Sequence, residues 1–129
     1  MSRHLLGIAA ALALFAGASA AHAADLKRGA NLAKLCAACH SLTDASNKIG
    51  PSLAGVIGRP MASVEGFTYS QAMKDHAAKD GSWDEAKLVA YLEDPRKTVP
   101  GTTMAFGGLK KLADRENIVA YLATLAPAP

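Results

Sequence analysis

The two cysteines of this 129-residue chain lie three positions apart and are followed at once by a histidine, in the run Cys36-Ala37-Ala38-Cys39-His40. Two cysteines at this spacing face the same side of a helical turn, so their sulfurs can reach two carbons along one edge of a porphyrin. The histidine then comes under the ring, where a neutral imidazole is a good iron ligand. The motif predicts covalent attachment of a haem through Cys36 and Cys39, with His40 as an axial ligand.

The C-x-x-C spacing also occurs in thioredoxin-like redox pairs, in structural disulfides and in zinc sites. A thioredoxin-like pair follows a hydrophobic strand, whereas residues 30–35 have a helical pattern. A zinc site needs more ligands, and outside residues 1–23 the only other histidine is His76. Haem attachment is therefore the favoured interpretation, and a disulfide is the main alternative.

The N-terminus has the pattern of a secretory signal peptide. Basic residues precede an Ala- and Leu-rich run over residues 5–18, and a small-x-small cleavage site ends at Ala23. We expect residues 1–23 to be removed, which leaves a single domain over residues 24–129. An uncleaved membrane tether is the alternative. In both cases the folded part is exported, and the expected location is the periplasm, because bacteria attach haem in this way outside the cytoplasm.

The composition leaves the core of this domain short of bulky side chains, since aromatic residues are only 5% of the chain. A porphyrin at the centre would supply the missing core, so the protein without haem is expected to fold poorly. The formal net charge of +3 is mild and says little about partners. We expect a monomer that does not bind nucleic acid.

The predicted fold class is all-α, because the chain after the signal segment has helical periodicity and no pair of alternating runs typical of a sheet. Asp25 is expected to cap a first helix that runs into the haem motif, where Gly29 would let another helix cross closely. Further helices are expected over residues 70–78, over residues 82–94 and from Asp114 to just before Pro127. In the second of these, Ser82 is the expected cap and Pro95 the stop. Residues 41–68 are expected to form a long loop that wraps a cofactor.

A haem iron held by one histidine has a second axial position to fill. The candidates outside the signal segment are Met61, Met73, Met104 and His76. Most methionines fill cores, but Met104 lies in a loop over residues 99–106 where proline and glycine can aim its thioether inward. We predict Met104 as the second ligand, and a loop methionine packed into the core is the alternative.

Several further motifs follow the cysteine motif in order along the chain. They are Gly50-Pro51-Ser52-Leu53, Gly58-Arg59, Gly66-Phe67-Thr68-Tyr69-Ser70, Trp83, Tyr91-Leu92-Glu93-Asp94-Pro95 and Pro100-Gly101-Thr102-Thr103-Met104-Ala105-Phe106. In these motifs the sequence resembles the class I c-type cytochromes, and specifically their mitochondrial-like and cytochrome c2-type branch. The resemblance covers essentially the whole chain after the signal segment. It implies a small single domain of helices and loops wrapped around one covalently bound haem c.

The resemblance also implies roles for residues around that haem. The carbonyl of Pro51 would accept a hydrogen bond from the far nitrogen of His40. The haem propionates would be bonded or flanked by Arg59, Tyr69, Ser70, Trp83 and Thr102. Tyr91 would lie near the Met104 sulfur, Phe106 would cover the exposed haem edge, and Gly29 would meet Tyr121 where the first and last helices cross.

The chain departs from the family pattern at several positions. Met73 stands where an asparagine is common, and Leu32 replaces a usual aromatic residue. Met61 and Ala62 occupy positions where a threonine and a glycine are common, and the segment over residues 74–82 is a few residues longer. These departures concern the polar network near the propionates and leave the iron ligands unchanged.

An iron with both axial positions occupied has no open site, so one-electron exchange is favoured over enzymatic chemistry. The resemblance implies a soluble periplasmic carrier between a cytochrome bc1-type reductase and a terminal oxidase of a respiratory chain or a photosynthetic reaction centre. Two other functions remain open. One is a haem enzyme or ligand sensor with a labile Met104, and the other is a membrane-anchored cytochrome subunit.

The basic residues near the haem-lining segments suggest how such partners would dock. They are Lys34, Lys48, Arg96, Lys97, Lys110 and Lys111, whereas acidic residues cluster elsewhere at Asp75, Asp80, Asp84, Glu85, Asp114 and Glu116. This separation predicts a basic ring around the haem edge that steers acidic partners and weakens with salt. A mixed, solvated surface is the alternative.

Overall fold

The computed structural model describes residues 23–127 of the chain. The predicted signal segment, residues 1–23, lies outside the described residues apart from its last one. Within the described part, no helix is long and apolar enough to cross a membrane. The described residues also form no strand, and their only β-type pairing is an isolated antiparallel bridge between Pro60 and Ser82. The predicted all-α class is confirmed.

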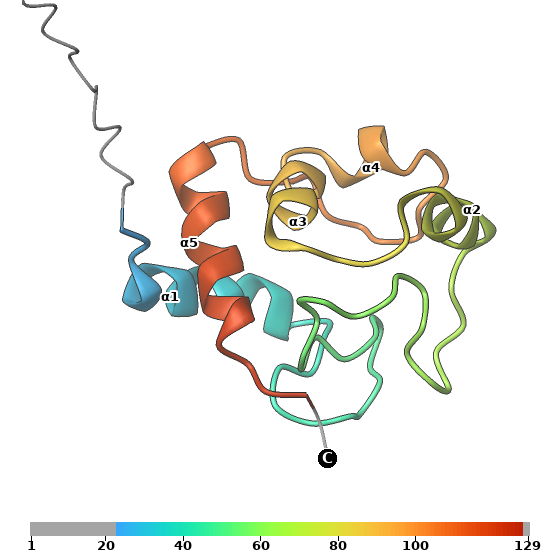
Figure 1. Ribbon diagram of the computed structural model, residues 1–129, viewed down its shortest axis with the longest axis horizontal. Coiled ribbons are helices and arrows are strands. Elements are labelled where there is room, and N and C mark those ends of the chain that lie inside the picture. The colour runs from blue at the N-terminus through green and yellow to red at the C-terminus, as the bar shows by residue number, and fades with distance from the viewer. Residues whose placement is uncertain (1–22, 128–129) are drawn as a thin grey trace, which may run out of the picture.

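The first and last helices, α1 (Leu26–Ala37) and α5 (Leu112–Ala123), cross each other on one side of the molecule (Figure 1). The start of α1 forms as predicted, because the side chain of Asp25 accepts the backbone N–H of Arg28 at 2.9 Å. The backbone N–H of Asp25 in turn donates to the side-chain oxygen of Asn117 at 2.8 Å. Ala33 from α1 and Ile118 from α5 are almost completely buried at this crossing. The crossing therefore anchors the helix that carries the cysteine motif.

Gly29 lies where these two helices pack closely against each other, as the sequence predicted. A Cβ atom there would overlap the backbone carbonyl of Asn117 and lie 2.9 Å from the Cβ of Tyr121. Backbone atoms of α5 cannot move aside without shifting the whole helix. Only glycine therefore fits this position.

Gly29→Ala is expected to lower the free energy of unfolding of the haem-loaded protein by about 2 kcal/mol, because overpacking outweighs the roughly 1 kcal/mol gain in helix propensity. Chemical denaturation would measure the change. Asn31→Ala is the matched control, since Asn31 is exposed on the same helix. Equal stabilities for the two variants would contradict this account of the crossing.

The helix predicted over residues 82–94 is shorter than expected. It is α3 (Glu85–Tyr91), and its cap is Asp84, whose side chain accepts the backbone N–H of Lys87 at 2.7 Å. Ser82 does not cap it, because residues 82–83 are extended and paired with the preceding loop. The N–H of Trp83 donates to the carbonyl of Arg59 at 2.9 Å, so tertiary pairing overrides the capping-box pattern.

Pro95 does not stop this helix directly. The helix ends at Tyr91, and Pro95 is the first residue of the short helix α4 (Pro95–Thr98). Asp94 caps α4 by accepting the backbone N–H of Lys97 at 3.2 Å. Proline suits this first position because it has no N–H to leave unbonded.

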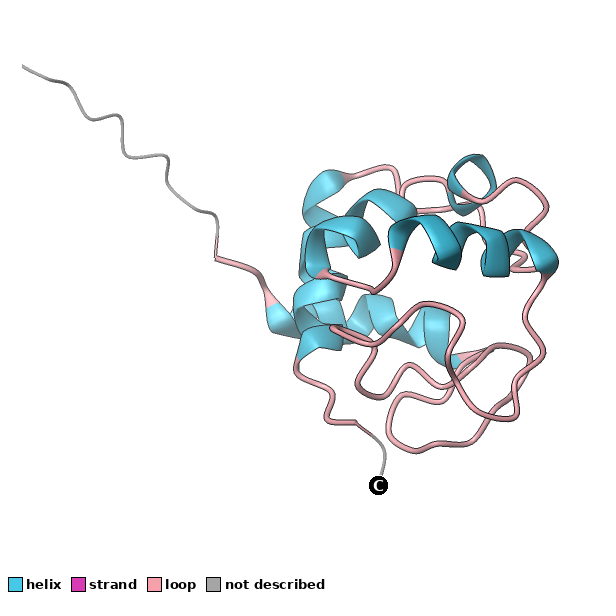
Figure 2. Cartoon of the chain, turned by 45° about the vertical axis from the view of Figure 1, so that its right-hand side comes forward, coloured by secondary structure: helices cyan, strands magenta, loops and turns pink. Residues whose placement is uncertain are grey.

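The remaining predicted helix and the long loop are confirmed. Helix α2 (Gln71–Asp80) begins after Ser70, whose hydroxyl accepts the N–H of Met73 at 3.1 Å. Between α1 and α2 the chain has no helix, and this stretch together with residues 99–111 forms the loops that occupy much of Figure 2. Helix α3 and the 99–111 segment lie on one side of the molecule, and the 41–69 loop lies on the other (Figure 1).

Candidate functional site

A cavity of about 270 Å³ lies between the end of α1, the 49–73 segment, α3 and the 102–106 loop. Its walls are mostly apolar, with Leu53, Val56 and Leu88 among them. All twelve residues predicted to bind the haem or its iron line this one cavity. They are Cys36, Cys39, His40, Pro51, Arg59, Tyr69, Ser70, Trp83, Tyr91, Thr102, Met104 and Phe106.

The cysteines are placed by the last turn of α1. The backbone N–H groups of Cys39 and His40 both donate to the carbonyl of Cys36, at 3.0 and 2.9 Å, which keeps the motif in a tight turn. The structure has no disulfide between the two cysteines. Burial, and secondarily the charge of Cys39, raise the pKa of the Cys36 thiol to about 11.

His40 is held in one tautomer by its neighbour. Its Nδ1 lies 2.6 Å from the carbonyl oxygen of Pro51. A carbonyl can only accept, so Nδ1 carries the proton and Nε2 keeps a free lone pair. Burial lowers the pKa of His40, the carbonyl of Pro51 partly opposes this, and the charges of Arg59 and Lys48 lower it further. The imidazole is therefore neutral, which is the form that binds iron.

Gly50 supports this imidazole, a role that the sequence analysis missed. A Cβ at Gly50 would lie 2.6 Å from Nδ1 and 2.8 Å from Nε2 of His40. The N–H of Gly50 also donates to the carbonyl of Cys39 at 2.8 Å, which ties the loop to the motif. The Gly-Pro pair was visible in the sequence, but it did not reveal which side chain the glycine would face.

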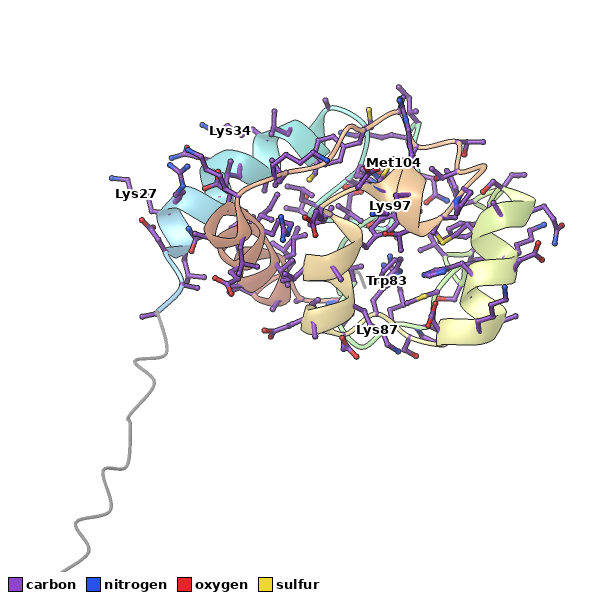
Figure 3. The ribbon with its side chains drawn as sticks, turned by 90° about the horizontal axis from the view of Figure 1, so that it is seen from above. Lys27, Lys34, Trp83, Lys87, Lys97 and Met104 are labelled. Atoms are coloured by element: carbon purple, nitrogen blue, oxygen red, sulfur yellow. The ribbon has the colours of Figure 1, made fainter. Side chains whose placement is uncertain are left out.

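Met104 reaches the cavity from the 99–106 loop. Its backbone N–H donates to the hydroxyl of Thr102 at 3.2 Å, and its sulfur lies 4.0 Å from the hydroxyl of Tyr91. Burial raises the pKa of Tyr91, with partial opposition from the Thr102 hydroxyl, so Tyr91 stays a neutral donor toward the sulfur. Figure 3 shows Met104 and Trp83 within the body of the molecule.

The other candidate ligands are placed differently. Met61 is 5% exposed, belongs to the apolar core and is absent from the cavity walls, whereas Met73 does line the cavity. His76 lies outside the walls, with Nδ1 3.1 Å from Asp80 and its ring centroid 6.4 Å from that of Trp83. His76 is therefore packed between Asp80 and Trp83, away from the cavity. The cavity thus brings one histidine and two methionines together.

Arg59 provides a positive charge at the cavity wall. Its guanidinium donates to the carbonyls of Ala54 and Ser52, at 3.1 and 2.9 Å. Among the described residues no carboxylate lies within salt-bridge distance of it. A half-buried cation without a partner favours an anionic group in the cavity. Burial lowers the pKa of Arg59, and the nearby Tyr69 partly opposes this shift.

Three of the other predicted propionate neighbours, Tyr69, Ser70 and Thr102, already bond the backbone. The Tyr69 hydroxyl accepts the N–H of Val64 at 3.1 Å, and Ser70 caps α2. Trp83 is 8% exposed, and its ring packs 5.0 Å from that of Tyr91. The cavity fits a haem with its anionic side groups. It has apolar walls, two cysteines, a neutral imidazole, a thioether and a cation without a carboxylate partner.

The structure also shows where the residues that depart from the family pattern lie. Ala62 lies on the cavity wall with φ of 55°, the left-handed region that favours glycine. Leu32 packs against the apolar core, as Met61 does. Met73 brings a thioether where a polar side chain is common. The cavity wall is therefore more apolar here than the family pattern implies.

The six basic residues of the predicted ring are all exposed. Lys34 points away from the molecule along α1 (Figure 3). Lys110 is partly neutralised, because it lies 3.8 Å from the carboxylate of Asp94. Among the acidic residues, Asp114 pairs with Arg28 at 2.6 Å. The ring itself stays a prediction.

Comparison with known proteins identifies the family and the relatives that this chain resembles. The sequence model of the cytochrome c family matches residues 26–126. The chain is 52% identical over 100 residues to a cytochrome c of Gibberella zeae, covering 76% of this chain and 92% of the relative. It is 45% identical to cytochrome c-550 of Ancylobacter novellus, over 75% of this chain and 92% of the relative. It is also 45% identical to cytochrome c2 iso-2 of Magnetospirillum fulvum, covering 70% of this chain and 92% of the relative.

Proposed function

Because this chain belongs to the cytochrome c family, we propose that it is a soluble periplasmic carrier of single electrons, with His40 and Met104 as the axial ligands of its haem iron. Proteins of this family carry one covalently attached haem c, and this chain is an electron carrier with the same cofactor. The bound haem supplies an iron that changes between the ferrous and ferric states by one electron. The protein then needs only to hold, tune and present that group.

The described residues account for this holding and tuning. Cys36 and Cys39 would attach the haem to α1. The carbonyl of Pro51 fixes the proton of His40 on Nδ1, so Nε2 would be free to bind the iron. Met104 would fill the second axial position and leave no open site, which supports a carrier rather than an enzyme. A soft thioether and apolar walls both favour ferrous iron, so a high reduction potential is expected.

The observation that carries the proposal is the convergence of one neutral imidazole, one loop thioether and both cysteines on a single apolar cavity. The bacterial relatives named as cytochrome c2 and cytochrome c-550 support a place in a bacterial electron-transport chain. The signal-like N-terminus supports export, with residues 24–129 as the mature domain. We propose a bc1-type reductase as electron donor and a terminal oxidase or reaction centre as acceptor.

Electron exchange with a purified bc1-type reductase tests this function and the basic ring together. The second-order rate is expected to fall about tenfold as ionic strength rises from roughly 20 mM to 500 mM. Arg96→Gln with Lys97→Gln should lower the rate several-fold at low ionic strength and have little effect at high ionic strength. Lys79→Gln is the control, because Lys79 is an exposed lysine on α2 outside the ring. A rate that does not depend on salt would contradict electrostatic docking.

A further inference from the structure

Among the described residues, Arg115 on α5 is the only buried residue with a charged side chain, and it is 7% exposed. Its Nη1 donates to the carbonyls of Leu109 and Lys110, at 2.7 and 3.0 Å, and its Nη2 lies 3.6 Å from the carboxylate of Glu93. Removing a cation from water costs free energy that such partners must offset. The guanidinium therefore joins α5 to the end of the 99–111 segment and to the turn after α3.

The 99–111 segment meets the end of α3 at the same place. The N–H of Leu109 donates to the carbonyl of Leu92 at 2.8 Å, and Lys110 Nζ donates to the carbonyl of Glu93 at 2.9 Å. Gly108 packs so closely that a Cβ there would overlap the carbonyl oxygen of Glu93. We call residues 92–93, residues 108–110 and Arg115 together the Arg115 clamp. The clamp fixes the far end of the 99–111 segment.

The loop between Val99 and this clamp carries Met104 and is held mainly at its two ends. At the first end, Val99 is 2% exposed, and its N–H donates to the carbonyl of Pro95 at 2.9 Å. The second end is the Arg115 clamp. Within the described structure, the hydrogen bonds of residues 100–107 join them to one another, to Val99 and to Tyr91. The position of Met104 therefore depends on how firmly both ends are held.

We propose that Arg115 is a positioning residue for the second axial ligand of the haem: by holding the clamp closed, it keeps the thioether of Met104 at the iron. Arg115 does not line the cavity, so it acts through the loop. Gly108 is only four residues from Met104, and a loop released there is free to move Met104 out of the cavity. Local opening of this kind needs less free energy than global unfolding. The inference rests on the proposed ligation of the iron by Met104.

The chemistry of the arginine side chain suits this role. A guanidinium presents several N–H donors in fixed directions, so Arg115 bonds two carbonyls and faces a carboxylate at once. A lysine ammonium on a flexible chain keeps the charge but not this geometry. The variant Arg115→Lys therefore loses only the geometry of the clamp, whereas Arg115→Gln loses both the geometry and the charge.

The test uses the haem-loaded protein and two independent measures of loop opening. Carbon monoxide reaches the ferrous iron only when Met104 leaves it, so its rate of binding at neutral pH reports how often the loop opens. Amide hydrogen exchange of residues 100–107 reports the same opening without involving the iron. Gly108→Ala is a second clamp variant, because its Cβ displaces the carbonyl of Glu93 and changes no charge. Asp25→Ala is the control, since it removes the cap of α1 and lowers global stability away from the clamp.

Arg115→Gln is expected to raise the rate of carbon monoxide binding and the hydrogen exchange of residues 100–107 by about tenfold. This factor corresponds to the loss of roughly one hydrogen bond to a charged group from the closed loop. Gly108→Ala is expected to change both rates in the same direction, and Arg115→Lys is expected to lie between Arg115→Gln and the wild type. Asp25→Ala is expected to keep the wild-type rates although it is less stable in chemical denaturation.

Wild-type rates in both Arg115→Gln and Gly108→Ala would overturn the proposal. An equal acceleration in Asp25→Ala would also overturn it, because the loop would then open only through loss of overall stability. If Arg115→Gln does not fold around haem, the comparison of Gly108→Ala with Asp25→Ala decides in the same way. An oxidised wild type without the far-red band of methionine-ligated haem would refute Met104 as the ligand, and with it the clamp, before any variant is compared.

Discussion

Replacing Met104 with alanine is expected to leave the haem covalently attached, to lower its reduction potential by on the order of a tenth to a few tenths of a volt, and to open the iron to external ligands. The thioether is a soft ligand that favours ferrous iron, so its loss favours the ferric state. The methionine is positioned by its bond to Thr102 and by the Tyr91 hydroxyl near its sulfur, and alanine cannot reach the metal. Redox titration and carbon monoxide binding to the ferrous protein at neutral pH measure both effects.

Met73→Ala is the matched comparison, because Met73 is the other methionine on the cavity wall. This variant is expected to keep both axial ligands and to exclude carbon monoxide. Unchanged ligand spectra for Met104→Ala, together with a new open site in Met73→Ala, would transfer the ligand role to Met73. Ready binding of carbon monoxide by the wild-type protein would instead support the ligand-sensor function.

Gly50→Ala is expected to displace the imidazole of His40 and to destabilise the haem-loaded protein by about 3 kcal/mol. The added Cβ would overlap the ring, with 2.6 Å to Nδ1 and 2.8 Å to Nε2. Neither the His40 ring nor the backbone at Gly50 can move easily. The ring is bonded to the carbonyl of Pro51, the next residue, and Gly50 itself is bonded to Cys39. Denaturation followed by haem absorbance measures the loss.

Gly107→Ala separates this clash from the general cost of changing a loop glycine. A Cβ at Gly107 would meet no atom within 4 Å, so the variant is expected to stay within about 0.5 kcal/mol of the wild type. If Gly50→Ala instead has the stability and spectrum of the wild type, the His40 ring is not confined as the structure indicates.

The parts of the fold predicted correctly depend on local signals. Asp25 caps α1 and Ser70 precedes α2 because a short polar side chain can bond backbone N–H groups only three residues away. Gly29 marked the helix crossing because a glycine inside a helix has a propensity cost that close packing must offset. The cysteine motif likewise depends on spacing within one turn.

The errors arose where distant segments meet. Ser82 matched a capping box, but its segment pairs with the loop around Arg59, so Asp84 became the cap. The packing of His76 against Trp83 also joins two separate segments, and no local pattern predicted it. No local sequence pattern predicted that Gly50 would pack against the imidazole of His40. Contacts of this kind depend on how the loops wrap the cavity, which one sequence does not specify residue by residue.

The most direct test of the account is the optical spectrum of the exported, purified protein in both oxidation states. We predict a c-type haem that resists removal by acid solvent, because Cys36 and Cys39 hold it covalently, and a weak far-red band in the oxidised form from ligation of the iron by Met104. Haem without that band would contradict the ligand assignment and reopen the enzyme or sensor function. A protein without covalent haem would contradict the central claim.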